Sequence, residues 1–150
     1  MSENIERLDI NRIEVRLKTA AGQNSGTNGI VFLAVAGREF RLGAGFAPGS
    51  TKTIILGEGA TVPNPQFNEP RDLIPLGLRS GFLQIPAWIR LEGSDDWQLE
   101  SVDVTINPGV PLHEVKYEWR LQPGKTVWLG PDTGGRYAFL TTRFPLADSV

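Results

Sequence analysis

The sequence has no cysteine, a single histidine and no long apolar run. Without cysteine the chain has no disulfide, no thiolate metal site and no cysteine nucleophile, and it is compatible with either redox compartment. The one histidine, His113, has no second histidine with which to form an H-E-x-x-H zinc helix, and no G-x-S-x-G nucleophile motif is present. The chain therefore lacks the residues and motifs of the common catalytic classes, and we do not expect an enzyme.

Charge and hydropathy exclude further classes. The 15 Lys and Arg residues nearly balance the 17 Asp and Glu residues, with no long run of either sign, which argues against a nucleic-acid partner. The first twelve residues carry charges where a secretory signal needs an apolar run. No later apolar run approaches the roughly 18 residues of a membrane-spanning helix. We therefore expect a soluble chain without a signal peptide or transmembrane segment.

The length of 150 residues, with 40% hydrophobic residues, suits one domain with a substantial core. It is too short for two domains of ordinary size. We predict a single domain over residues 1–150, in which residues 1–9 form a flexible N-terminal lead.

The apolar residues of this chain follow a period of two, the period of β-strands. Ile13, Val15 and Leu17 alternate with charged residues, which is typical of a strand with one buried face. Residues 30–36 are nearly all apolar, which predicts a strand covered on both faces, with residues 30–33 in the core. Further strands are predicted over 38–42, 51–56, around Pro86, 97–106, 114–121, 125–130 and 136–144.

These short strands are separated by many of the 17 glycines and 11 prolines, a pattern that favours an antiparallel sandwich or barrel. We predict an all-β fold, an antiparallel β-sandwich of about eight strands. The irregular residues 60–76 fit a surface loop or a short helical turn, and the glycine-rich residues 43–49 fit a turn.

In one stretch, residues 92–107, the apolar residues do not keep one alternation along the strand. Trp97 and Leu99 have odd numbers, whereas Val102 and Val104 have even ones. A continuous strand would point these two sets of side chains at opposite faces of the sheet.

Two loops are rich in oxygen ligands. Residues 22–29 offer amide and hydroxyl side chains, and residues 93–97 offer the carboxylates of Asp95 and Asp96. Hard cations such as Ca²⁺ bind carboxylates together with amide and backbone carbonyl oxygens. The same residue types are also common in ordinary tight turns, so both interpretations stay open.

The chain resembles the PLAT domain, named for polycystin, lipoxygenase and alpha-toxin. The resemblance rests on three blocks, "IEVRLKTAAGQNSGTNGIVFLAVAG", "STKTIIL" and "AWIRLEGSDDWQLESVDVTI". It covers roughly residues 10–106 and leaves the last third of the chain poorly matched. It implies a bend or bulge near Glu100 and Ser101, which would bring both sets of residues in 97–104 into the core.

In calcium-binding PLAT members the ligands come from the two oxygen-rich loops. The resemblance therefore implies calcium ligands at four positions: Asn24, Gly26 through its carbonyl, Asp95, and Asp96 through its carboxylate or its carbonyl. Calcium-binding members often have Asp where this chain has Asn24 and Asn28. With fewer negative charges, any calcium site should be weak.

PLAT domains dock onto lipids or proteins and do not catalyse. The resemblance implies a non-catalytic docking module that binds a membrane surface or a protein partner, with weak calcium dependence. The alternative is a structural or assembly subunit that binds other proteins without lipid or metal. Phe46, Phe67 and Trp88 are the candidate contacts because they fall in loop-like segments, whereas Trp97 and Trp128 are assigned to the core.

Overall fold

A computed structural model describes residues 7–73, 76–77, 85–110, 113–122, 127–130 and 136–143. Strands β2 to β5 span Arg12–Thr19, Thr27–Val35, Arg38–Phe46 and Thr51–Gly57. Strands β7, β8, β9 and β11 span Ala87–Glu92, Trp97–Ile106, Val115–Arg120 and Tyr137–Arg143. The two-residue strands are β1 (Arg7–Leu8), β6 (Leu76–Gly77) and β10 (Trp128–Leu129), and two 3-10 turns, η1 (Pro65–Phe67) and η2 (Pro70–Asp72), follow β5.

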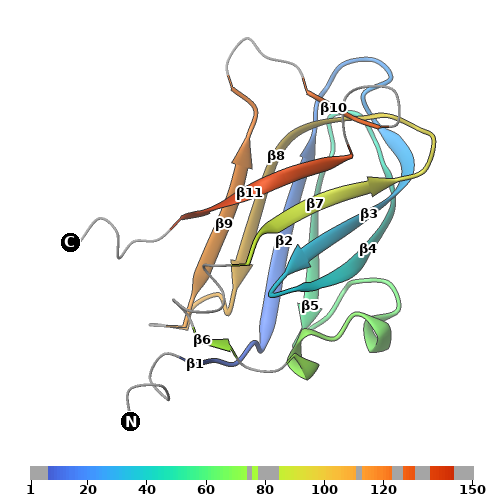
Figure 1. Cartoon of the computed structure of the whole chain (residues 1–150). Helices are drawn as coiled ribbons and strands as arrows, with labels where there is room; N and C mark the ends of the chain where they lie inside the picture. The colour runs from blue at the N-terminus through green and yellow to red at the C-terminus, as the bar shows by residue number, and fades with distance from the viewer. Residues whose placement is uncertain are drawn as a thin grey trace.

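The eight longer strands form an antiparallel sandwich, which confirms the predicted fold class. Along the hydrogen-bonded path the order is β4-β3-β7-β11-β9-β8-β2-β5, with β10 added to β8 and a separate β1–β6 pair. β11 joins the two layers, because its first half pairs with β7 and its last three residues pair with β9. Figure 1 shows β5, β2, β8 and β9 as one layer and β4, β3, β7 and β11 as the layer that crosses it.

The change in β8 from apolar residues at odd positions to apolar residues at even positions is caused by a β-bulge. Lys18 of β2 pairs with Ser101 and Thr19 pairs with Leu99, so Glu100 is the extra residue. Trp97, Leu99, Val102 and Val104 are all fully buried. The prediction that a bulge at this point brings both sets of side chains into the core is confirmed.

Three local predictions differ from the structure. Only Val31 and Leu33 of residues 30–33 are fully buried, since strand alternation leaves Ile30 and Phe32 half-buried on the outer face. Trp128 is also half-buried, and its neighbour Leu129 enters the core instead. The predicted turn over residues 43–49 is largely strand, because β4 continues to Phe46.

Candidate functional site

The loop between β2 and β3 is shaped by its own hydrogen bonds. The Ser25 hydroxyl is buried and lies 2.6 Å from the carbonyl oxygen of Gly22, to which it donates. A side chain at Gly26 would bring its Cβ within 2.5 Å of the Phe46 carbonyl oxygen, so only glycine lets the loop lie this close to β4. Asn24 adopts the left-handed conformation, with a φ of 66°.

This loop and the loop between β7 and β8 come together at one end of the sandwich. The Thr27 hydroxyl donates to the Asp95 carbonyl at 3.0 Å, and the Asn28 amide donates to the Asp95 carboxylate at 2.7 Å. Nearby, the backbone amide of Gln98 donates to the Ser25 carbonyl at 2.9 Å. The two oxygen-rich loops of the sequence are therefore joined in space, and Asp95 is the residue that joins them.

An open groove of about 540 Å³ lies between these loops and the end of β4. Three of the four predicted metal ligands, Asn24, Gly26 and Asp95, line it. Its remaining lining residues are Thr27, Asn28, Gly45, Phe46, Ala47 and Pro48. The groove is thus lined by one carboxylate together with neutral amide, hydroxyl and backbone groups.

Asp96 is not part of the groove lining. Its Oδ1 atom is buried without a hydrogen-bond partner among the described residues, and a Cβ at Gly130 would lie 1.8 Å from it. Asp96 therefore packs against β10 and its following residue. Within the described ranges, no group of three or more His, Cys, Asp or Glu side chains gathers as a metal cluster. The donor set fits a hard cation through oxygen, with one carboxylate in place of the two expected.

The three predicted surface contacts have three different environments. Phe46 is only 2% exposed and packs on Trp97 with ring centroids 5.2 Å apart, so the prediction that it contacts a lipid or partner is wrong. Its position at the end of a strand, pointing inward, is the physical reason. Phe67 is 73% exposed on η1, and Trp88 is half-buried on β7.

The η1 turn that carries Phe67 is held against the first residues of β4. Arg38 donates to the carbonyls of Phe67 and Glu69 at 3.1 and 3.2 Å, and the buried Asn68 accepts from the Arg41 amide at 2.8 Å. The groove lies at the other end of the same strand. A nine-residue strand is about 26 Å long, so Phe67 and the groove sit at opposite ends of the sandwich (Figure 1).

Trp88 belongs to a cluster that the sequence reasoning missed. Its ring makes edge contacts with Tyr137 and Phe139 at centroid distances of 5.7 and 6.0 Å, and the latter two rings lie parallel to each other at 5.9 Å. Tyr137 and Phe139 are 47% and 60% exposed. We call the outer surface formed by Phe32, Trp88, Tyr137 and Phe139 the aromatic face. Its signal in the sequence is the alternation of Tyr137 and Phe139 with two buried residues, Ala138 and Leu140.

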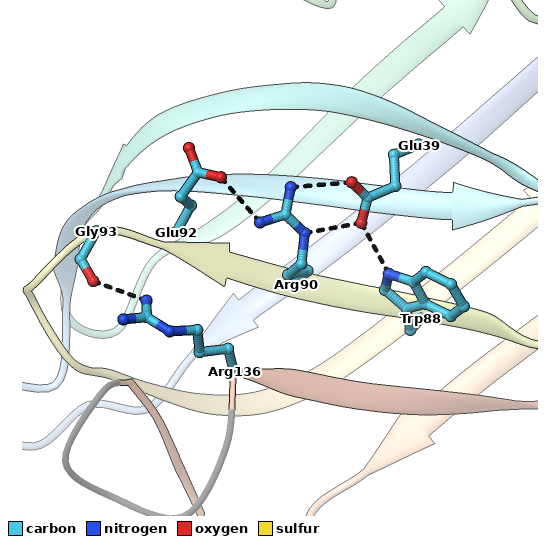
Figure 2. Close-up of polar contacts among 6 residues, drawn as sticks. All are labelled: Glu39, Trp88, Arg90, Glu92, Gly93 and Arg136. Carbon is cyan, nitrogen blue, oxygen red and sulfur yellow. Dashed lines mark hydrogen bonds and ion pairs between the residues drawn. The ribbon is translucent and has the colours of Figure 1, made fainter.

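A polar network lies beside these rings. Figure 2 shows Glu39 accepting hydrogen bonds from the Trp88 indole and from Arg90, whose guanidinium also donates to Glu92. The Arg90 guanidinium stacks on the Phe32 ring at 4.2 Å. Hydrogen bonds from Arg90 lower the pKa of the Glu39 carboxyl, and burial has a smaller opposing effect. The hydrogen bond to Glu39 in turn raises the pKa of Arg90.

Comparison with known proteins identifies the fold. No protein-family model and no curated protein sequence matches this chain. Alpha toxin from Clostridium absonum is similar in structure, with a TM-score of 0.55 and 22% identity over 88% of this chain and 31% of the toxin chain. Two engineered variants of a lipoxygenase match with TM-scores of 0.52 and 0.51 and 11% identity, over 88% of this chain and 16% of theirs.

The chain thus spans under a third of the toxin chain and about a sixth of the lipoxygenase chains. Alpha toxin and lipoxygenase are two of the three proteins for which the PLAT domain is named. The fold of this chain is the PLAT-like β-sandwich.

Proposed function

We propose that this chain is a non-catalytic docking module that binds a lipid surface or a protein partner, with weak calcium dependence. The observation that carries the proposal is the meeting of the two oxygen-rich loops at Asp95, at one end of a PLAT-like sandwich. The likeness to parts of a toxin and of a lipoxygenase supports a module that serves a larger assembly.

The groove supports calcium-dependent contact with anionic lipid. Ca²⁺ takes six to eight oxygen ligands, and Asp95, Asn24 and the backbone carbonyl of Gly26 are the residues that would hold it. One carboxylate neutralises only half of its charge. The remaining charge and coordination positions favour oxygen ligands from outside the protein, such as the phosphate and carboxylate groups of an anionic lipid. A site of this composition belongs near the weak limit for calcium modules, with a Kd on the order of 10⁻⁴ to 10⁻³ M.

Phe67 serves a separate contact in this proposal. Because it lies at the opposite end of β4 from the groove, a domain that stands on a membrane with its groove end does not bring Phe67 to that membrane. A lipid contact through the groove would depend on calcium, whereas a contact through Phe67 would not. The two modes are therefore distinguishable by experiment.

The alternative function, an assembly subunit that binds proteins without lipid or metal, is favoured by a different observation. Tyr137 and Phe139 expose much of their rings on a broad sheet face rather than at a loop tip. Exposed aromatic side chains gathered on one face are typical of protein-binding surfaces.

Co-sedimentation with phosphatidylserine vesicles tests the lipid proposal. We expect the parent protein to pellet with vesicles in millimolar Ca²⁺ and to stay in solution with Mg²⁺ or chelator. Asp95→Asn should abolish the calcium effect, because it removes the one carboxylate of the groove while keeping the oxygen that accepts from Asn28. Asp96→Asn is the matched control and should behave like the parent.

Three results would contradict the calcium-dependent mode: no vesicle binding by the parent, binding that chelator does not reduce, or equal loss in both variants. Phe67→Ser separates the two modes. If binding is insensitive to chelator and is lost in Phe67→Ser, then the contact is made at the η1 end. If none of the proteins binds vesicles, then the assembly function replaces the lipid function.

A further inference from the structure

The aromatic face has the composition of a protein interface. Its rings come from three neighbouring strands: Phe139 pairs with Trp88 across β11 and β7, and Trp88 pairs with Ala34 of β3. Arg90 lies between Tyr137 and Phe32 in the next row. Trp, Tyr and Arg are the residue types that most often dominate binding energy at interfaces. Here one of each lies in a single patch beside a phenylalanine that is 60% exposed.

The Trp88 indole and the Glu39, Arg90 and Glu92 side chains of this face are hydrogen-bonded to one another. Both carboxylate oxygens of Glu39 accept hydrogen bonds from Arg90, at 2.8 and 2.9 Å, and one of them also accepts from the Trp88 indole. The remaining guanidinium nitrogen of Arg90 donates to Glu92 at 2.9 Å. A network that is already paired can be covered by a protein without leaving an unpaired buried charge.

The same network argues against two other occupants. A membrane would have to cover the ion pairs together with the rings, because Arg90 lies in register between Tyr137 and Phe32, and charged groups are costly in hydrocarbon. A carbohydrate would need donors and acceptors for its hydroxyl groups. Each guanidinium nitrogen of Arg90 and both carboxylate oxygens of Glu39 already make a hydrogen bond within the protein, which leaves few donors and acceptors for a sugar. A protein surface can bury the aromatic rings without breaking the hydrogen bonds between Arg90 and Glu39.

The distribution of charge on this face favours a second copy of the same face as the partner. Among the side chains that the structure describes on these strands, the outward charged ones are Arg41, Arg90, Glu39 and Glu92, so this part of the face carries both signs in equal number. A partner with a strong charge of either sign gains no attraction from it. A second copy of the same face brings equal numbers of each sign and the same rings. Two-fold pairing of identical patches is also the commonest form of protein assembly.

We propose that the aromatic face is a self-association surface, on which a second copy of this chain packs sheet against sheet as a two-fold dimer. Phe139, Tyr137 and Trp88 form its centre. Sheets that pack in this way lie about 10 Å apart, a distance that interdigitated aromatic side chains can fill. The rings of this surface include neither a residue that lines the calcium groove nor Phe67, so the proposal stands or falls independently of lipid binding.

Sedimentation velocity and light scattering test the dimer proposal. They measure the oligomeric state at protein concentrations from micromolar to millimolar, without vesicles or calcium. We expect the parent to show a concentration-dependent dimer. Phe139→Ser should raise the dimer dissociation constant about tenfold or more, as truncation of an interface hot spot does. Because Phe139 is 60% exposed, this variant should keep its fold, which a melting curve would verify.

Phe67→Ser is the matched control, because it removes the same ring from a position that is 73% exposed but lies outside the aromatic face. It should leave the dimer constant unchanged. Tyr137→Ser provides a second variant within the face and should weaken the dimer in the same direction as Phe139→Ser. The proposal is overturned if the parent stays monomeric at every concentration. It is equally overturned if Phe139→Ser weakens the dimer no more than Phe67→Ser does.

Discussion

The two outer faces of this sandwich are built on the same backbone pattern but carry opposite chemistry. On the layer β5-β2-β8-β9 the outward residues of the central strands are almost all polar, such as Glu14, Arg16 and Asp103. On the layer β4-β3-β7-β11 they include Phe32, Trp88, Tyr137 and Phe139. The inner faces of both layers share one apolar core.

The outward residues of a strand indicate whether its face is stable in water or is stabilised by being covered. On the charged face, Arg16, Asp103 and Glu118 form one row across three strands, and Arg120 pairs with Asp103. Such a row is stable in water and needs no cover. On the aromatic face, the row Ala34, Trp88 and Phe139 exposes rings that would be more stable if covered.

The largest effect on stability is expected at Glu100, the extra residue that lets the apolar side chains on both sides of the bulge face the core. Deleting Glu100 removes the extra residue of the bulge, so Trp97 and Leu99 would turn onto an outer face or Val102 and Val104 would do so. Each such side chain loses about 1.5 to 3 kcal/mol of burial, which together approaches the roughly 5 to 15 kcal/mol stability of a typical domain. We expect no cooperatively folded protein by circular dichroism and thermal melting.

Glu100→Ala is the control for this deletion. It removes only the exposed ion pair with Lys18, with its 2.9 Å contact, and keeps the residue count of the strand. It should therefore stay within about 0.5 kcal/mol of the parent. A deletion variant that melts like the parent would contradict the account of the bulge.

The next largest effect is expected at the network of the aromatic face. Glu39→Gln weakens hydrogen bonds from Arg90 and Trp88, and the Arg90 and Glu39 side chains are only 17% and 31% exposed. Hydrogen bonds to charged groups contribute about 1.5 to 3 kcal/mol, and partial solvation reduces this, so we expect a loss of about 1 to 2 kcal/mol. Urea unfolding near neutral pH measures it. A loss below about 0.5 kcal/mol would make this pair no different from an ordinary surface ion pair.

The same substitution should change the acid side of the stability profile. Hydrogen bonds from Arg90 hold the pKa of Glu39 below its ordinary value of 4.5 in the folded protein. The stabilisation is therefore complete above that value and is lost as the pH falls through the lower folded pKa. Unfolding curves between about pH 6 and pH 3 should lose stability less steeply in Glu39→Gln than in the parent. Equal slopes would mean that Glu39 does not contribute to this dependence.

The alternation of apolar residues was sufficient to predict most of the longer strands, whereas the bulge and the ligand positions in the two loops were predicted from the family resemblance. Period-two alternation is a local property, so Ile13, Val15 and Leu17 are correctly assigned to the core from their spacing alone. The position of the bulge came from the family resemblance, because the change of parity between Leu99 and Val102 fixes only that one residue must be extra.

The errors have a common physical cause, which is that exposure depends on tertiary neighbours. Phe46 follows two glycines and so suggested a loop, but β4 continues through both of them. Asp96 adjoins Asp95, yet consecutive residues diverge, and only Asp95 lines the groove. The Glu39–Arg90 network joins residues 51 positions apart, which no local pattern reveals.

The smallest effect is expected on the charged face, where Asp103→Asn is the counterpart of Glu39→Gln. Arg120 and Asp103 are paired like Arg90 and Glu39, but their side chains are 46% and 38% exposed. Arg120 also keeps hydrogen bonds to the carbonyls of Val102 and Trp119 at 2.9 and 3.1 Å, so its guanidinium stays in place when the carboxylate is neutralised. We expect a change within about 0.5 kcal/mol, and this change should shrink further in molar salt because exposed charges are screened. Urea unfolding of both variants at low and high salt makes the comparison directly. If Asp103→Asn costs as much as Glu39→Gln, then the two faces do not differ in how water screens their ion pairs, and the distinction drawn between them would be one of shape and hydrophobicity alone.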